Sequence, residues 1–222
     1  MTLLGFDTST SASSACVLRA DGEAFELNPP VERLSARPAH ASELMPAVAE
    51  VMERAGVAYP DLTAIAVGVG PGTFTGLRIG VATARALATA AGLPLRRVSS
   101  LAALAAGIDA PLRLPLIDAR RGELFAALHD GDGVVWPPFA ASPEDLLARL
   151  QDGGLTPLAA GDGSIRFRGT LEEAAIPVSP QDSEAHVVRA LHVCRLAAGA
   201  PDEAPEAVLP EYLREPDAKP QQ

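Results

Sequence analysis

The chain has 222 residues, of which 48% are hydrophobic, and a formal net charge of −10. This length suits one large domain or two small ones with a substantial core. The acidic balance disfavours a protein that binds nucleic acid on its own, because Lys and Arg supply most of the affinity for phosphate. Contact with RNA is therefore expected only through a partner.

Only one of the 18 basic residues is a lysine, Lys219 in the C-terminal tail. Mechanisms that need a core lysine, such as a Schiff base or a P-loop, therefore have no candidate. The two cysteines, Cys16 and Cys194, are expected to be small core residues in a reducing cytoplasm. The sequence has neither an apolar run of about 18 residues nor a basic leader, which predicts a cytoplasmic protein without membrane anchor.

The first elements along the chain are three expected strands, the last two joined by the hairpin signal Asp21-Gly22. They cover residues 3–7, 15–19 and 24–27. A similar pattern returns mid-chain, with a strand ending at Asp118, a strand over 123–128, an Asp-Gly-Asp-Gly turn and a strand over 134–136. This internal repeat predicts two related lobes, residues 1–107 and 108–222, each opening with a β-meander.

Hydrophobic spacing and capping signals predict the remaining elements. Helices are expected over residues 40–55, 76–91, 101–106, 143–150 and 183–198, and strands over 95–98 and 158–160. Pro46 either kinks the first turn of its helix or marks its true start. The tail after residue 200 is rich in proline and acid, and is expected to lie over the surface or fray.

The stretch AIAVGVGPGTFTGLRIGVATARALA, residues 64–88, runs from an apolar strand through a Gly-Pro-Gly loop into a helix. Both familiar nucleotide motifs fail there: Leu77 follows Gly76 where a Walker loop needs lysine, and Thr73 stands where a dinucleotide fingerprint needs glycine. Two interpretations stay open. The helix N-terminus, capped by Thr73 or Thr75, holds an anion, or the glycines only allow a tight turn.

Mostly small residues fall on or near one face of the helix that follows this loop. They are Gly76, Gly80, Thr83, Ala84, Leu87 and Ala91. Small residues let two helices approach closely, so this face is predicted to pack on another helix, either that of residues 40–55 or one in another chain. Replacing Gly80 with Leu is then expected to weaken association and leave the fold intact.

Catalytic patterns are sparse. The four histidines, His40, His129, His186 and His192, have no metal-ligand spacing and are expected at the surface or as caps. No nucleophile–base pair or zinc motif is recognisable. Asp7 and Asp118 each end a strand, and either hold a cation between the lobes or simply form turns.

Several segments together resemble the TsaB (YeaZ) family. They are LLGFDTST, HASELMP, AVGVGPGTFTGLRIGVATARALA, VSSLAALA, PLIDARRGELFAAL, AGDGS and LPEYLR. This family comprises the bacterial partner subunits of the machinery that makes N6-threonylcarbamoyladenosine (t6A) at position 37 of tRNAs reading ANN codons. The resemblance implies an α/β, two-lobed actin-like ATPase (ASKHA, RNase H-like) fold, with Asp7, Thr8 and Asp118 at a vestigial nucleotide cleft.

The resemblance further implies a non-catalytic scaffold that pairs with the catalytic subunit TsaD and receives the ATPase TsaE. ATP, Mg²⁺ and the catalytic metal would belong to those partners, with no cofactor or metal in this chain, and tRNA would be reached only through the complex. The isolated chain is expected to form a homodimer. The implied partner and dimer interface comprises His40, Leu44, Met45, Met52, Gly76, Gly80, Thr83, Ala84 and Leu87.

Two other functions remain as alternatives to the scaffold. The first is a stand-alone actin-fold ATPase or small-molecule kinase that uses Asp7 and Asp118 with Mg²⁺. The second, ranked last, is a glycoprotease-like peptidase, because the sequence offers no evident catalytic set for it.

Overall fold

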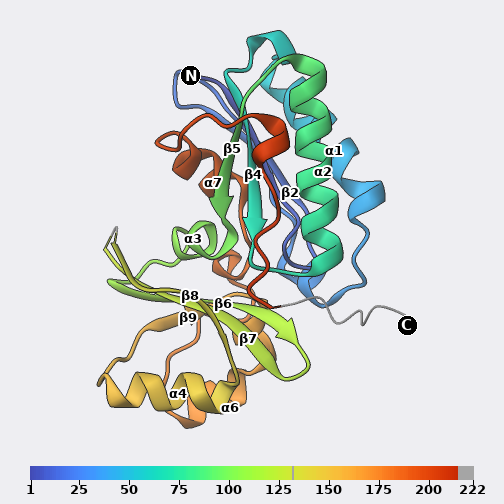
Figure 1. The fold of residues 1–222 in the computed structure, drawn as a ribbon. Coiled ribbons are helices and arrows are strands. Elements are labelled where there is room, and N and C mark those ends of the chain that lie inside the picture. The colour runs from blue at the N-terminus through green and yellow to red at the C-terminus, as the bar shows by residue number, and fades with distance from the viewer. Residues whose placement is uncertain (132, 215–222) are drawn as a thin grey trace, which may run out of the picture.

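The computed structural model describes residues 1–131 and 133–214, and its strands form two sheets (Figure 1). The first sheet contains β1 (Leu3–Asp7), β2 (Ser14–Leu18), β3 (Ala24–Leu27), β4 (Ala64–Gly70) and β5 (Leu95–Ser99). The second contains β6 (Leu112–Arg120), β7 (Glu123–Asp130), β8 (Gly133–Ala141) and β9 (Leu158–Ala160). The last eight residues of the predicted tail, with Lys219, lie outside the described residues.

The two sheets repeat one topology. The first has the strand order β3-β2-β1-β4-β5 and the second β8-β7-β6-β9. In each, three strands form an antiparallel meander, and the next strand pairs in parallel with the first of the three. The predicted internal repeat is therefore confirmed, and Asp7 and Asp118 lie at equivalent ends of β1 and β6.

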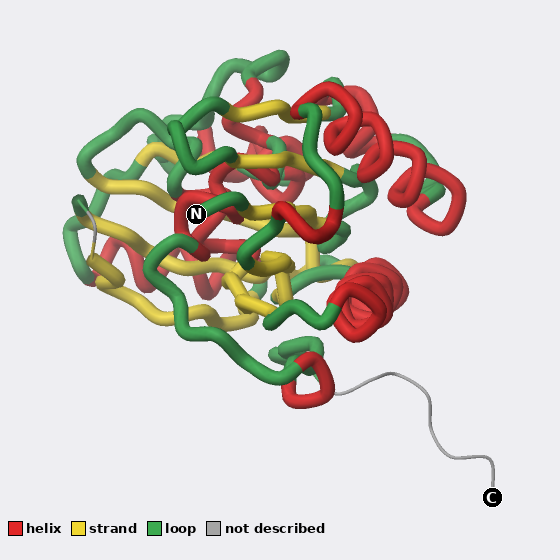
Figure 2. The backbone as a smooth tube through the Cα atoms, turned by 90° about the horizontal axis from the view of Figure 1, so that it is seen from above, coloured by secondary structure: helices red, strands yellow, loops and turns green. Residues whose placement is uncertain are grey.

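Two long helices, α1 (His40–Ala55) and α2 (Phe74–Ala91), cover one face of the first sheet. Seen from above (Figure 2), both lie on the same side of the strands. Each ends at a left-handed glycine, Gly56 or Gly92, which is the usual helix stop. Pro46 lies inside α1, so the helix starts at His40 and not at the proline.

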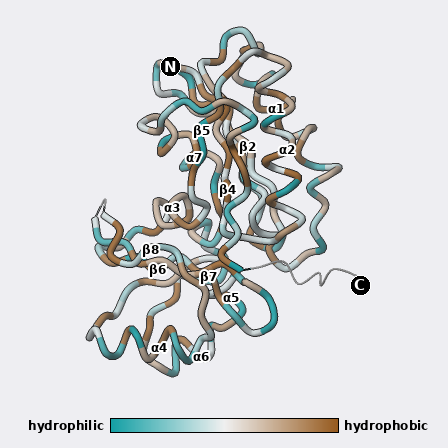
Figure 3. The backbone as a smooth tube through the Cα atoms, viewed as in Figure 1, coloured by the Kyte–Doolittle hydropathy of each residue, from teal (hydrophilic) through white to brown (hydrophobic). Residues whose placement is uncertain are grey.

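The described residues form four core clusters, of which the three larger ones hold these layers together. One lies between α1, α2 and the first sheet, and includes Phe6, Val48 and Val81. The second joins the lobes, since it contains Leu3 of the first sheet and Phe125 of the second. The third lies under the second sheet, against α4 (Pro143–Asp152) and α6 (Arg168–Glu173). The apolar colouring in Figure 3 follows β4 and its neighbours.

The chain returns to the first sheet after residue 187. Helix α7 (Ala190–Ala197) packs on β1 and β2, and α3 (Ser100–Ala105) lies between the sheets. Glu26 of β3 fixes this return, because its carboxylate pairs with Arg189 and accepts a hydrogen bond from the Leu191 amide at 2.9 Å. The packing therefore departs from a division into residues 1–107 and 108–222 for this last part of the chain.

Some predicted helical boundaries were wrong. The helix expected over 183–198 begins only at Ala190, because Val187 is extended and buried, and Val188 follows it into the core. The Ser14 hydroxyl donates to the Val188 carbonyl at 2.7 Å, a contact between distant parts of the sequence. Two short helices, α5 (Asp162–Arg166) and α6, occupy a region for which the sequence predicted no helix. No helix in the described ranges is long and apolar enough to cross a bilayer.

Candidate functional site: the interlobe cleft and the α1–α2 face

A cleft of about 500 Å³ opens between the lobes. Its walls come from the start of α2, the end of β6 and the C-terminal tail. The lining residues include Pro38, His40, Gly72–Gly76, Asp118–Arg120, Phe125 and Glu211–Arg214. Among the predicted cleft residues, Asp118 reaches this cavity, whereas Asp7 and Thr8 lie behind its wall.

Asp7 is fully enclosed by its own chain. Its carboxylate accepts hydrogen bonds from the amide and hydroxyl of Ser9, at 2.7 and 2.6 Å, and from the Ser100 hydroxyl at 2.7 Å. Burial raises the pKa of Asp7, and the hydrogen bonds from Ser9 and Ser100 oppose that rise. This carboxylate closes the turn after β1 and joins it to α3, which matches the turn-forming alternative.

Asp118 is 5% exposed and paired with two arginines. One carboxylate oxygen accepts from the guanidinium of Arg120 at 3.0 Å and from that of Arg166 at 2.9 Å, and the other accepts from the Arg120 amide at 2.8 Å. Arg120 has a positive φ of 65°. A positive φ is energetically unfavourable for residues other than glycine. The ion pair with Asp118 and the hairpin turn together hold Arg120 in this backbone conformation.

A third acid, Asp162, was not predicted as a site residue although it lies in the quoted GDGS segment. Its carboxylate accepts from the Asp118 amide at 3.0 Å, and both aspartates line a smaller cavity of about 250 Å³ with Arg120 and Arg166. Burial, with the nearby charge of Asp118, raises the pKa of Asp162 to about 6. Its position depends on β6 and α5 meeting in space, which no local pattern reveals.

Asp162 should make stability depend on pH. The pKa of Asp162 in the folded state lies above the ordinary value of 3.8. The contribution of Asp162 to the free energy of unfolding is therefore fully present below pH 3.8 and is lost as the pH rises through about 6. The loss amounts to about 3 kcal/mol. Asp162→Asn keeps the acceptor and cannot ionise. Urea unfolding should therefore show that the variant is more stable relative to the parent at pH 7.5 than at pH 4. If the difference in the free energy of unfolding between variant and parent is the same at both pH values, the raised pKa of Asp162 is refuted.

The Gly-rich loop packs on the turn after β1. The Thr73 amide donates to the Ser9 carbonyl at 2.7 Å, and a Cβ on Gly72 would lie 2.5 Å from that oxygen. Thr73 occupies the cap position of α2 as expected, but its side chain makes no capping hydrogen bond. Close approach to a neighbouring loop is therefore a sufficient reason for these glycines.

The small face of α2 meets Thr8. The Thr8 hydroxyl donates to the Gly76 carbonyl at 2.8 Å. A Cβ on Gly76 would lie 2.0 Å from the Thr8 carbonyl oxygen, and one on Gly80 would lie 2.3 Å from the Thr8 hydroxyl oxygen. The stripe thus serves close packing on a loop of the same chain at these two glycines. The first residue of α1 also approaches Gly76, since a Cβ there would lie 3.2 Å from His40 Nε2.

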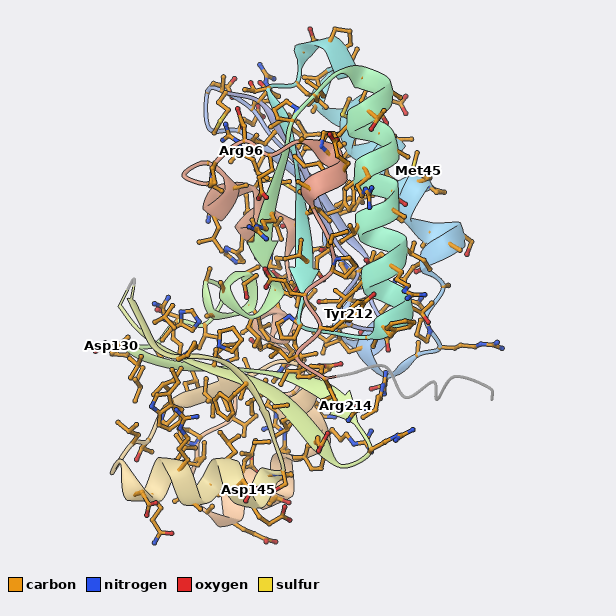
Figure 4. The ribbon with its side chains drawn as sticks, in the orientation of Figure 1. Met45, Arg96, Asp130, Asp145, Tyr212 and Arg214 are labelled. Carbon is orange, nitrogen blue, oxygen red and sulfur yellow. The ribbon has the colours of Figure 1, made fainter. Side chains whose placement is uncertain are left out.

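The residues expected at the partner interface differ in their exposure to solvent. Six of them are buried within this chain: His40, Leu44, Met52, Gly76, Gly80 and Ala84. Thr83 and Leu87 are half-buried, and Met45 is 44% exposed on the outer side of α1 (Figure 4). The surface open to another chain is the outer face of α1 and α2, hereafter the α1–α2 face: Ala41, Met45, Ala49, Ala82, Thr83, Ala86, Leu87 and Ala90.

The histidines are more buried than expected. His40, His129 and His186 are at most 8% exposed. His186 Nε2 lies 2.9 Å from the Pro180 carbonyl oxygen, which gives it a structural role. His40 Nδ1 lies 2.8 Å from the Ser13 hydroxyl, a serine–histidine contact that the sequence did not reveal, and burial lowers the pKa of His40. Within the described ranges, no three His, Cys, Asp or Glu residues are grouped to hold a metal.

Comparison with known proteins gives consistent results. The family model for tRNA N6-adenosine threonylcarbamoyltransferase (TsaD) matches residues 34–168. An uncharacterized protein of Mycobacterium tuberculosis is 35% identical over 227 residues, covering 99% of this chain and 94% of that protein. The Escherichia coli tRNA threonylcarbamoyladenosine biosynthesis protein TsaB is 37% identical over 139 residues, 60% of this chain and 56% of that protein. The match thus spans about half the length of TsaB.

Solved structures extend the likeness to the whole fold. A Pseudomonas aeruginosa protein described as similar to peptidase YeaZ has a TM-score of 0.81 at 29% identity, covering 96% of this chain and 99% of that one. YeaZ from the same organism has a TM-score of 0.77 at 28% identity, covering 95% and 100%. The predicted α/β, two-lobed actin-like fold is confirmed. The chain belongs to the TsaB (YeaZ) family, within the wider family that the TsaD model describes.

Proposed function

We propose that this chain is a non-catalytic, cytoplasmic subunit in t6A biosynthesis, which pairs with a TsaD-like catalytic subunit through the α1–α2 face. A TsaE-like ATPase docks on that pair, and tRNA is reached only through the assembly. ATP, Mg²⁺ and the catalytic metal belong to the partners in this proposal. The names of the TsaB relatives support a role in t6A biosynthesis. The contacts of Asp7 and Asp118 within the chain support the proposal that catalysis belongs to the partner subunits.

One observation carries the proposal: the strand-end carboxylates of both lobes are already satisfied inside the chain. A Mg²⁺ ion at Asp118 would have to displace the guanidiniums of Arg120 and Arg166. At Asp7 it would have to break hydrogen bonds from Ser9 and Ser100 in a site that is 1% exposed. Hard cations need carboxylate oxygens that are free to coordinate. A supporting role therefore fits this cleft better than phosphoryl transfer.

The α1–α2 face has the charge distribution of a docking surface. Its α1 side carries Glu43, Glu50 and Glu53, with Arg54 in the last turn, whereas α2 carries Arg78 and Arg85 and no acidic residue. The centre of the face consists of small apolar side chains with Met45 among them. An apolar centre with charged edges is typical of specific interfaces. The acidic and basic sides also complement each other across a two-fold axis, which favours the expected homodimer of the isolated chain.

Ala86→Arg tests the surface directly. Arginine has nearly the helix propensity of alanine, so the fold should persist, while a long charged side chain at the centre of the face must be desolvated on docking. We expect binding to a TsaD-like subunit, measured by isothermal titration calorimetry, to weaken at least about tenfold.

Ala148→Arg is the matched control, because Ala148 is an exposed alanine on α4 of the other lobe. It should leave the affinity for the TsaD-like subunit unchanged. Equal affinities of the Ala86 and Ala148 variants would place the interface elsewhere. ATP hydrolysis by the purified chain alone, at a rate comparable with that of an actin-fold kinase, would instead support the stand-alone enzyme.

A further inference from the structure

The described end of the chain crosses from one lobe to the other. Val208 is fully buried in the core of the first lobe, and residues 211–214 then form part of the wall of the interlobe cleft. Figure 4 shows Tyr212 beside the lower end of α2 and Arg214 next to the second lobe. This segment, residues 208–214, is called the strap below.

Backbone hydrogen bonds attach the strap and the residues before it to the first sheet. Glu203 exchanges both backbone hydrogen bonds with Leu95 of β5, at 2.9 and 2.8 Å. The Glu211 amide donates to the Val69 carbonyl at 2.8 Å. The absence of a side chain at Gly70 allows this contact, because a Cβ there would lie 2.8 Å from the Glu211 carbonyl oxygen. The strap is therefore a fixed part of the first lobe as far as Glu211.

Tyr212 anchors the strap on the first turn of α2. Its ring packs on Phe74 with a centroid separation of 5.2 Å, and Arg78 lies over the same Phe74 ring at 3.8 Å. The Arg78 guanidinium also donates to the Tyr212 hydroxyl at 3.2 Å. An aromatic pair with a cation over it is worth about 1–2 kcal/mol. The anchor is thus strong enough to order the strap without being buried.

The strap ends on the second lobe. Arg214 forms an ion pair with Glu123 at 2.5 Å, and Glu123 is the first residue of β7, directly after the hairpin turn that follows Asp118. Behind the cleft the lobes already share a core cluster. A smaller cluster of Ala12, Leu34 and Val187, with Ile165 of α5 packed against it, also joins the lobes. The strap adds a further connection, across the cleft wall formed by residues 211–214.

We propose that residues 208–214 are a latch that fixes the angle between the two lobes. A shared core at the base leaves rotation of the lobes as the softest motion, because hinge motion needs few contacts to change. A tether across the cleft removes that freedom by joining β4 and α2 of the first lobe to the β6–β7 hairpin of the second. The lobe angle is then set by the chain itself, without a ligand in the cleft.

The latch is tested by measuring the distance between the lobes. Cysteines replacing Ala20 and Ala148, exposed in the first and second lobes, accept spin labels, while Cys16 and Cys194 are fully buried. Distance distributions by pulsed electron spin resonance should be narrow in the parent. Tyr212→Ala and Arg214→Ala should each broaden the distribution and shift it to a longer mean distance.

Reversing the charges supplies the decisive comparison. Glu123→Arg alone should broaden the distribution, and Glu123→Arg combined with Arg214→Glu should narrow it again. Arg54→Ala, which removes a surface pair with Glu50 near the end of α1, away from both labels, should leave it unchanged. Circular dichroism confirms that each variant is folded. Distributions in the Tyr212 and Arg214 variants that coincide with the parent would overturn the latch, whatever the chain binds.

Discussion

Replacing Gly76 with alanine is expected to lower the free energy of unfolding by about 2–3 kcal/mol, although alanine is the better helix former. The added Cβ would lie 2.0 Å from the Thr8 carbonyl oxygen, which is backbone and cannot turn away. Either the turn after β1 or the start of α2 must move. Urea unfolding of the two proteins measures the difference.

Gly169→Ala is the control for this experiment. Gly169 also lies in a helix, α6, but no atom lies within 4 Å of the position its Cβ would take. Its replacement should leave stability unchanged or raise it by up to about 1 kcal/mol. If the Gly76 variant is as stable as the Gly169 variant, the close contact between α2 and Thr8 is wrong. A leucine at Gly80 would bring its Cβ to 2.3 Å from the Thr8 hydroxyl oxygen, so this substitution tests packing within the chain as well as association.

Asp7→Ala is expected to cost about 2–3 kcal/mol of stability, because it leaves the Ser9 amide and the Ser9 and Ser100 hydroxyls buried without their acceptor. Asp7→Asn keeps one acceptor oxygen and should cost less. A larger loss of stability for Asp7→Ala than for Asp7→Asn is expected if the carboxylate is structural, and is not expected if it is only a vestigial ligand. Denaturant unfolding that leaves the alanine variant as stable as the parent would contradict the structural role.

The sequence predicted the fold well where the signal is local. Asp21-Gly22 and the turn glycines mark hairpins, so both meanders and their repetition around Asp7 and Asp118 were expected and found. Local periodicity also predicted α1 and α2, with boundaries within two residues. It failed over residues 183–189, where a short 3-10 helix (Glu184–His186) is followed by an extended segment that the Ser14–Val188 contact holds and no neighbouring residue specifies.

The candidate site was harder to predict, because its residues meet only in three dimensions. Spacing identified Gly76 and Gly80 as one small face, but it could not show that Thr8 fills the space beside them. Asp118 was recognised as a strand end, whereas its pairing with Arg166 depends on how α5 lies against β6. The predicted interface contained Met45, Thr83 and Leu87 of the exposed side of the helix pair, but mixed them with buried residues, because the apolar residues at helical spacing include both core and surface positions.

The most direct test of the proposed function is reconstituted t6A formation on a tRNA that reads an ANN codon, with the catalytic subunit and ATPase of the same organism present throughout. Adding this chain should raise the amount of modified adenosine at least about tenfold. The Ala148→Arg variant should raise the amount of modified adenosine as much as the parent chain does. The Ala86→Arg variant should not raise it at the same concentration. Formation of t6A at the same rate without this chain would contradict the proposal that it is a required scaffold.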